Sequence, residues 1–295
     1  METIRSTDRA RGVHTLMVVL LVVAWSSTFA AIKLGLEYCP PLLFAGLRAL
    51  LGGAAMAAFA WRPGMSLRWR TTWPTYLLLA FLNVVLFLGL QTVAIMDLPT
   101  GMAAVLLYLQ PVLTGLLAWP VLGESLSVTK MLGLLLGFAG IVTVSWDGLN
   151  GDIAPQGVAI ALVAAVAWAF GTVLVKRKEE MLVGPVTITV QFVIGGAALT
   201  ALGLVVEGPA EITWVPGLWV GLGYSALVGT TLAWALWFWL IRAGEASRAA
   251  AFIFFVPLSA IAIGAVLLDE QVTPLLAVGA ALVVAGIILV NRRRR

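Results

Sequence analysis

Long apolar runs separated by short polar segments dominate the chain from about residue 13 to residue 291. Each run is close to the roughly 20 residues that a helix needs to cross a bilayer. The pattern predicts ten spanning helices, at residues 13–34, 41–60, 74–95, 100–120, 128–146, 155–175, 185–206, 215–239, 247–268 and 273–291. No polar stretch between them is long enough for a soluble domain, so we expect one all-α integral membrane domain over residues 1–295.

The first apolar run follows a basic start, as a signal peptide does, but it has no clear small-residue cleavage site. Its length also suits a full span better than a cleaved leader. We therefore interpret residues 13–34 as a retained first helix.

One stretch of the sequence occurs twice. Residues 106–124 (LLYLQPVLTGLLAWPVLGE) align without a gap with residues 252–270 (FIFFVPLSAIAIGAVLLDE) when Pro111 is placed on Pro257. A proline inside a helix leaves a carbonyl unpaired and bends the helix. A membrane protein tolerates this mainly where protein or a water-filled cavity covers the exposed backbone. The same register pairs Glu124 with Glu270, Gly133 with Gly279, and Gly140 with Gly286.

The beginnings of the two halves also match, because AWSSTFAAIK at residues 24–33 resembles AWAFGTVLVK at residues 167–176. Five spans per half is an odd number, so the second half begins on the opposite side of the membrane from the first. We therefore expect two inverted five-helix repeats around a central cavity, at residues 13–146 and 155–291. Bent helices in equivalent places suggest a transport path along the pseudo-symmetry axis.

Positive charge gathers on one side of this predicted topology. Every Lys and Arg except Lys33 and Arg48 lies in or beside the segments on the side of the N-terminus. The other side carries acidic residues such as Glu37, Asp97 and Glu207. The positive-inside rule then predicts that both termini are cytoplasmic, in a multi-pass protein of the bacterial inner membrane. The net charge of +4 is spread over short connections and does not suggest nucleic-acid binding.

The composition excludes several classes of protein. With 61% hydrophobic and 11% charged residues, the chain must have lipid as its solvent. One cysteine, Cys39, and one histidine, His14, leave no internal disulfide and no Cys- or His-cluster metal site, so we expect no cofactor. No phosphate-binding P-loop is present, so ATP is not the expected energy source.

Together these features resemble the EamA-type permeases of the drug/metabolite transporter superfamily, and among them the YddG-type bacterial aromatic amino-acid exporters. The resemblance rests on the ten spans, the AW…K openings and the P…GE ending, and it covers nearly the whole chain. It implies a central cavity lined by spans 1–4 and 6–9, with spans 5 and 10 outside as scaffold. Because Phe254 and Val256 stand where the first half has Tyr108 and Gln110, we expect an asymmetric site whose polar part comes mostly from the first half.

Arg48 lies about two turns into the second predicted span, in the outer half of the bilayer. A charge there costs roughly 2.5–3.5 kcal/mol on insertion scales unless it is paired or hydrated. Intramembrane charges usually face the protein interior. This favours a cavity-facing cation that holds a substrate carboxylate or closes the outer gate, over a side chain that reaches to the outer headgroups.

Aromatic and polar side chains away from the ends of the spans are the other candidates for substrate binding. Amides in mid-membrane need a partner or water, and walls of Trp and Tyr suit an amphipathic small molecule. For any single ring, packing between helices is the ordinary alternative. Besides Arg48, the candidates are Trp25, Ser27, Asn83, Tyr108, Gln110, Trp168, Thr172, Tyr224, Trp234 and Trp237.

No Asp or Glu lies at mid-depth in any predicted span. Proton-driven transporters usually carry a buried carboxylate or histidine, so we favour facilitated diffusion over a proton-coupled multidrug or metabolite antiporter. Glu124, Glu270 or His14 could reverse this preference.

The predicted function is the export of aromatic or neutral amino acids and similar amphipathic metabolites by alternating access. A nucleotide-sugar carrier would need several cavity cations, and only Arg48 is placed for that role. A channel would show an oligomeric pore motif, and a membrane enzyme acting on lipid-like substrates would show clustered carboxylates or a His/Ser/Cys set, and neither is visible. We therefore expect no enzymatic activity, and a small molecule and the lipid bilayer as partners. The glycines at helix-packing spacing are expected to pack within the fold of a monomer.

Charged residues at the ends of the spans suggest gates. We expect Lys33 to pair with Glu270 on the outer side and Lys176 with Glu124 on the inner side, one pair breaking as the other forms. Each residue could instead be a solvated helix-end charge. With these four residues we assign Pro111 and Pro257 to gating, because they bend the equivalent helices.

We predict that Lys33→Glu and Glu270→Lys each slow transport, and that the double swap restores it because the pair is rebuilt with reversed charges. A double-mutant cycle on transport rates in proteoliposomes measures this coupling. A double variant no faster than the single variants would contradict the pairing.

Overall fold

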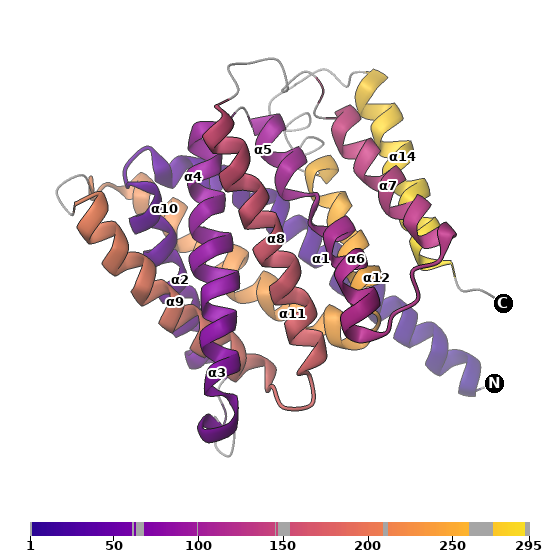
Figure 1. Ribbon diagram of the computed structural model, residues 1–295. Coiled ribbons are helices and arrows are strands. Elements are labelled where there is room, and N and C mark those ends of the chain that lie inside the picture. Colours follow the sequence, from indigo (N-terminus) through magenta and orange to yellow (C-terminus); the bar gives the residue numbers. More distant parts are fainter. Residues whose placement is uncertain are drawn as a thin grey trace.

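The computed structural model describes residues 2–60, 62, 68–98, 100–144, 146, 154–208, 212–259 and 274–292. All regular structure within these residues is helical, and they contain no strand (Figure 1). In chain order the helices of the first half are α1 (Glu2–Leu36), α2 (Pro41–Ala60), α3 (Trp69–Leu79), η1 (Ala80–Gly89), α4 (Leu90–Asp97), α5 (Thr100–Leu107), α6 (Gln110–Leu122) and α7 (Val128–Val144). Those of the second half are α8 (Pro155–Arg177), α9 (Gly184–Val206), α10 (Pro216–Tyr224), η4 (Ser225–Leu232), α11 (Ala233–Ala243), α12 (Ala246–Ala251), η5 (Phe252–Phe254) and α14 (Pro274–Asn291).

Among the described residues, seven helical stretches are long and apolar enough to cross a membrane, judged by length and composition. Three further apolar helices, Val128–Thr143, Ala246–Ser259 and Ala277–Asn291, are shorter. These stretches fall on the ten predicted spans. The all-helical, multi-pass architecture is therefore confirmed, while the count of ten spans stays a prediction.

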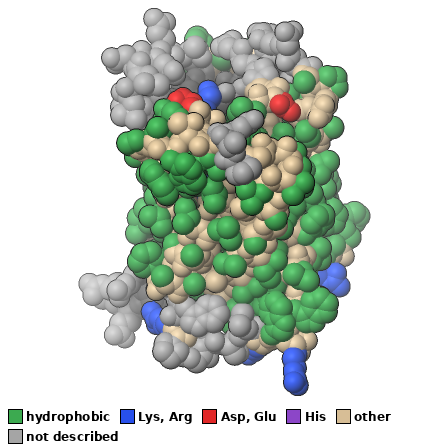
Figure 2. Space-filling view, turned by 90° about the vertical axis from the view of Figure 1, so that its left-hand side faces the viewer, with side chains coloured by type: hydrophobic (Ala, Val, Ile, Leu, Met, Phe, Trp, Pro, Cys, Tyr) green, Lys and Arg blue, Asp and Glu red, His purple; other side chains and the backbone are tan. Residues whose placement is uncertain are grey.

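The bundle has one acidic and one basic end. Asp97 and Glu207 lie where α4 and α9 finish, and we call this end the acidic face. Lys176, Arg242 and Arg248 lie where α8 finishes and where α11 gives way to α12, and we call this end the basic face. Figure 2 shows acidic side chains near one end, basic side chains mostly at the other, and a band rich in hydrophobic side chains between them. That band is the surface that lipid tails would cover.

The helices α7 and α14 lie side by side at the edge of the bundle, with their backbones in contact (Figure 1). A Cβ atom on Gly133 would lie 2.7 Å from the carbonyl oxygen of Gly286, and one on Gly140 would lie 2.7 Å from that of Gly279. Since Gly279 and Gly286 are the repeat copies of Gly133 and Gly140, each glycine contacts the copy of the other. A two-fold axis between antiparallel helices produces this reciprocal pattern.

The second helices of the two halves, α2 and α9, pack in the same way. A Cβ atom on Gly46 would lie 2.6 Å from the backbone nitrogen of Thr200, and one on Gly196 would lie 2.8 Å from that of Leu50. Small residues that let backbones approach are the usual device for joining helices in lipid, where apolar surface gains nothing by leaving the solvent. These glycines thus pack against other helices of the same chain.

Both repeat prolines follow an interruption of their helix. The helix α5 ends at Leu107 and α6 begins at Gln110, so Pro111 lies in the first turn of α6. In the second half the 3₁₀ turn η5 separates α12 from helical residues 255–259, which include Pro257. The helices are therefore interrupted at nearly equivalent places in the two halves, just before the repeat prolines.

The third helix of each half widens into a π-helix at its centre. The segment η1 connects α3 to α4, and η4 connects α10 to α11. In η4 the hydroxyls of Thr230 and Thr231 donate to the carbonyls of Ser225 and Ala226, five residues earlier, both at 3.1 Å. Wide turns of this kind occur frequently at functional sites. The sequence analysis did not predict them.

We predict that Gly286→Ala destabilises the protein. The new Cβ atom would lie 2.5 Å from the nitrogen of Gly137 and 2.6 Å from the carbonyl oxygen of Gly133, so α7 and α14 must move apart. Overpacking of this kind costs about 1–3 kcal/mol, which a lower Tm of the detergent-solubilised protein reports.

The matched control is Gly223→Ala, where nothing lies within 4 Å of the new Cβ atom. Its Tm should equal or slightly exceed that of the parent protein. Equal Tm values for the two variants would contradict the close approach of α7 and α14.

Candidate functional site

Aromatic side chains fill the centre of the bundle. The rings of Trp25 on α1 and Trp168 on α8 meet edge to face, with centroids 5.5 Å apart. Trp168 also stacks on Phe87 of η1 at 4.4 Å, and Trp237 of α11 lies 5.7 Å from Trp25. Edge-to-face and offset arrangements are those that aromatic pairs prefer. Because Trp25 and Trp168 are equivalent in the repeat, their contact lies at the pseudo-two-fold axis.

A small cavity borders this cluster on the side toward the acidic face. Its volume is about 30 Å³, enough for one or two water molecules and far below a typical ligand pocket. The predicted central cavity is therefore mostly filled in this conformation, because tryptophan rings from both halves occupy the mid-membrane volume. The lining residues are Trp25, Thr28, Phe29, Ile32, Arg48, Phe87, Gln91, Leu107, Tyr108, Trp168, Gly229 and Trp234.

Arg48 is the charged group of this cavity. Its side chain comes from α2, roughly 10 Å along the helix from Pro41, and the residue is 4% exposed. Its Nε and Nη1 atoms have no hydrogen-bond partner among the described residues. A buried charge without a partner is strongly unfavourable. The arrangement therefore suits an anion or water that enters the cavity.

Five of the predicted binding residues line the cavity, and one supports it. Trp237 does not line the cavity but packs against Trp25 and Trp168, with ring centroids 5.7 and 6.2 Å away. The rings thus come from both halves, while the charge comes from the first half alone. The lining residues that the sequence predicted are Trp25, Arg48, Tyr108, Trp168 and Trp234.

The predicted amides lie beside the cavity, in buried polar contacts. The Nδ2 atom of Asn83 donates to Oε1 of Gln191 at 3.0 Å. The Nε2 atom of Gln110 donates to the hydroxyls of Thr114 at 2.9 Å and Thr172 at 3.2 Å. None of these residues lines the cavity in this conformation. They join helices to one another, which is the role that buried amides commonly have in membranes.

Two other predicted residues lie on the outside of the bundle. The hydroxyl of Tyr224 donates to the hydroxyl of Ser27 at 2.8 Å, and Tyr224 is 40% exposed. Ser27 follows Trp25 by two positions, which turns it about 200° around α1, away from the cavity. Neither residue reaches the cavity in this structure, so a role in binding has no support here.

The sequence did not point to seven of the lining residues: Thr28, Phe29, Ile32, Phe87, Gln91, Leu107 and Gly229. Gln91 is an amide within a predicted span, the same signal that selected Asn83. Thr28 follows Trp25 by three positions and so shares its helix face. Nothing in the sequence distinguishes Phe29 and Phe87 from packing residues.

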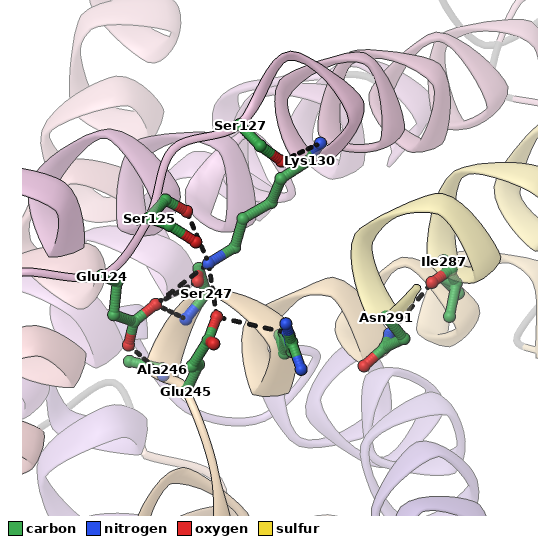
Figure 3. A network of polar contacts seen from close by, with 10 residues as sticks. Glu124, Ser125, Ser127, Lys130, Glu245, Ala246, Ser247, Ile287 and Asn291 are labelled. Atoms are coloured by element: carbon green, nitrogen blue, oxygen red, sulfur yellow. Dashed lines mark hydrogen bonds and ion pairs between the residues drawn. The ribbon is translucent and has the colours of Figure 1, made fainter. Parts of the chain in front are cut away.

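A second feature lies at the basic face, where Glu124 follows the end of α6. Its carboxylate accepts from the backbone N–H groups of Ala246 at 2.6 Å and Ser247 at 3.3 Å, and from the Ser247 hydroxyl (Figure 3). Ala246 is the first residue of α12. A carboxylate from the first half therefore caps a helix of the second half, where it also complements the helix dipole.

Lys130 completes this contact. Its Nζ atom lies 3.3 Å from Glu124 and 2.7 Å from Glu245, which also lies 3.2 Å from Nε of Arg248. The side chains of Lys130 and Glu124 are only 5% and 9% exposed. We call Glu124, Lys130, Glu245 and Ser247 the basic-face latch, because they connect the α6–α7 turn to the α11–α12 turn.

The predicted pair of Lys176 with Glu124 is not formed in this structure. Glu124 is occupied by Lys130 and the start of α12, and Lys176 binds Glu179 at 2.8 Å, three residues further along its own chain. Lys33 is exposed near the end of α1. Its predicted partner Glu270 lies outside the described residues, so that pair stays a prediction.

The acidic face has a cap between the halves as well. The two carboxylate oxygens of Glu207 accept from the backbone N–H groups of Leu42 at 2.8 Å and Leu43 at 2.9 Å, at the start of α2. Cys39 is buried in the preceding turn. Burial, and secondarily the Glu207 carboxylate, raises the pKa of the Cys39 thiol to about 12. This supports a structural role for Cys39 rather than a reactive one.

A two-fold helical bundle with a buried cation among aromatic rings at its centre is the architecture of a small-molecule membrane transporter. Within that class the chain belongs to the EamA-like transporter family, whose model matches residues 14–146 and 155–292.

Similar proteins agree with this assignment. The Uncharacterized transporter YvbV of Bacillus subtilis (strain 168) is 38% identical over 280 residues, which cover 95% of this chain and 92% of that protein. The Probable amino-acid metabolite efflux pump of Escherichia coli (strain K12) is 30% identical over 285 residues, which cover 92% of each. A protein crystal structure with 23% identity has a TM-score of 0.81, covers 95% of this chain and 96% of its own, and supports the fold alone.

We predict that Glu124→Ala accelerates hydrogen exchange at the amides of Ala246 and Ser247, because both lose their acceptor. The loss of a helix cap, about 1 kcal/mol, corresponds to roughly fivefold faster exchange. Exchange mass spectrometry on a peptide that covers residues 244–252 measures it. Glu179→Ala removes only the contact to Lys176 and should leave this peptide unchanged. Identical exchange in the parent protein and Glu124→Ala would show that the cap is not formed in solution.

Proposed function

We propose that the protein exports aromatic or neutral amino acids and similar amphipathic metabolites by alternating access. The observation that carries this proposal is the partnerless guanidinium of Arg48, which faces a cavity walled by Trp25, Trp168 and Trp234. A guanidinium binds carboxylates bidentately, and the rings offer apolar surface for a side chain. The name of the Escherichia coli relative, an amino-acid metabolite efflux pump, points to the same class of substrate.

In this proposal the structure represents a closed state of the transport cycle. The cavity is too small for an amino acid, and the basic-face latch connects the two halves below it. Release of Glu124 from the start of α12 would let α6 and α12 separate and open the basic face. The interruptions before Pro111 and Pro257 are where these helices would bend.

The repeat supplies an equivalent contact for the other face. In the register that places Glu124 on Glu270, Ala246 corresponds to Thr100, the first residue of α5. We propose that Glu270 caps α5 in the opposite state of the cycle, together with its pair to Lys33. One cap would then form as the other opens.

We further propose that the basic face is cytoplasmic in the bacterial inner membrane. This follows from the positive-inside rule applied to the basic residues at that face. This orientation makes both termini cytoplasmic, as the sequence analysis expects.

Facilitated diffusion is the energetic mode that we favour. The described carboxylates with cross-half contacts, Glu124, Glu207 and Glu245, lie at the two faces and not at mid-membrane. A proton-coupled antiporter is the second candidate, because protonation of the buried Glu124 would remove its attraction to Lys130 and loosen the latch. His14 lies near the same face, 5.9 Å from the ring of Trp239.

The test is flux of labelled phenylalanine and leucine from proteoliposomes, with and without a pH gradient. We expect downhill flux without a gradient, and a reduction of roughly tenfold or more in Trp168→Ala, as for the loss of an aromatic anchor. Trp219→Ala is the control, because Trp219 is exposed on α10 and does not line the cavity.

If flux requires the pH gradient, transport is coupled to protons and is not facilitated diffusion. If no aromatic or neutral amino acid moves, the substrate assignment fails, whereas the fold and the family remain.

A further inference from the structure

We propose that the cavity recognises its substrate through a carboxylate and provides no anionic partner for an ammonium group. Organic acids with an apolar body would then bind as well as the amino acids of the same shape. The inference rests on the proposed function and narrows its substrate class to compounds that carry a carboxylate.

Free donors in the cavity match a carboxylate. Nε and Nη1 of Arg48 and Nε1 of Trp168 are buried and donate to no described residue. Both side chains line the same cavity. A carboxylate accepts through two oxygens with about four lone-pair sites, so it can satisfy all three donors and neutralise the guanidinium. The indole nitrogen is a donor only, so it cannot serve a cation.

No charged acceptor for an ammonium group lies among the described lining residues. None of these residues is acidic, and the sequence has no Asp or Glu at mid-depth in any predicted span. The acceptors that line the cavity are neutral, namely the carbonyl of Gly229, which already accepts from Nε1 of Trp25 at 3.3 Å, and the side-chain oxygens of Thr28, Gln91 and Tyr108. An ammonium group that leaves water without an anionic partner is costly to bury.

Ring faces are the remaining partner for a cation, and they are partly covered. Phe87 stacks on Trp168 with ring centroids 4.4 Å apart, and Phe192 and Trp234 meet edge to face at 5.1 Å. The positive charge of Arg48 in the same small volume also repels an ammonium group. The balance of contacts therefore favours a net anion over a zwitterion, and both over an amine.

The apolar part of the lining sets the shape of the bound molecule. Phe29, Ile32 and Leu107 face the cavity together with the tryptophans. A compound that places its carboxylate on Arg48 would direct its apolar body against these side chains. The recognised class is thus a monocarboxylate with a hydrophobic, ring-sized body.

Three ring-matched compounds test this on the full-length protein in nanodiscs: phenylpropionate (carboxylate only), phenylalanine (carboxylate and ammonium) and phenethylamine (ammonium only). Binding to the folded state raises the Tm, and at equal ligand concentration the rise is larger for the compound with the lower Kd. We expect a rise with phenylpropionate at least equal to that with phenylalanine, and none with phenethylamine, at equal concentrations near neutral pH.

Variants of Arg48 assign the effect to the cavity. Arg48→Gln should abolish the rise with phenylpropionate, and Arg48→Lys should keep a smaller one, because an ammonium lacks the bidentate fork of a guanidinium. Arg292→Gln removes an exposed arginine after the end of α14 and should behave as the parent protein. If Arg48→Gln does not fold, the order of the Tm rises that the three compounds cause in the parent protein still tests the inference.

The possible results separate this inference from the proposed function. A rise with phenethylamine equal to that with phenylalanine overturns the inference and leaves amino-acid transport standing. The same conclusion follows if phenylalanine raises the Tm, or is transported in proteoliposomes, while phenylpropionate causes no rise in Tm. If none of the three compounds binds and no amino acid is transported, the proposed function itself fails.

Discussion

The close approach of helices from opposite halves is the constraint on which the rest of the structure depends. In lipid, apolar surface gains little by leaving its solvent, so helices associate through packing and hydrogen bonds. Here α7 packs on α14, and α2 packs on α9, at distances that only glycine permits at the contact points. These two pairs form a frame related by the two-fold axis. Because their backbones are in contact, they have little freedom to separate, and the broken or widened helices lie elsewhere in the bundle. Close backbone packing and helix interruption thus fall on different helices, at the positions of a few glycines and two prolines.

The centre of the bundle combines a tryptophan cluster with the guanidinium of Arg48, and these two stabilise each other poorly. The tryptophan cluster excludes water, and a guanidinium in such surroundings is strongly unfavourable without an anion. An anion bound to the guanidinium would lower this energy. Substrate binding would therefore stabilise this arrangement of the helices.

Much of this architecture could be predicted from the sequence, because it depends on local patterns. Apolar runs predict helices, and the repeated proline and glycines predict bends and packing faces at equivalent places. Arg48, Trp25, Tyr108, Trp168 and Trp234 could be selected because a charge or a ring at mid-span is conspicuous. What could not be predicted depends on how each helix is rotated and which residue it meets. Ser27 and Tyr224 are polar residues at mid-span too, yet they lie on the outside of α1 and α10. Lys176 is the repeat copy of Lys33, and the sequence predicts its pairing with Glu124. In the structure Glu124 binds Lys130 instead, because the turn between α6 and α7 places Lys130 nearer. The widening of η1 and η4 has no local signal that we can identify.

The reciprocal caps have a consequence for how the protein is made. Glu207 holds the start of α2, and Glu124 holds the start of α12, so each half completes a helix end in the other. During synthesis α2 enters the bilayer long before residue 207 leaves the ribosome, and its first amides lack this acceptor until α9 has been inserted. The N-terminal half is thus an incomplete assembly intermediate, whose final form is reached only when the second half arrives in the opposite orientation. The two caps can therefore form only when the halves have inserted in opposite orientations.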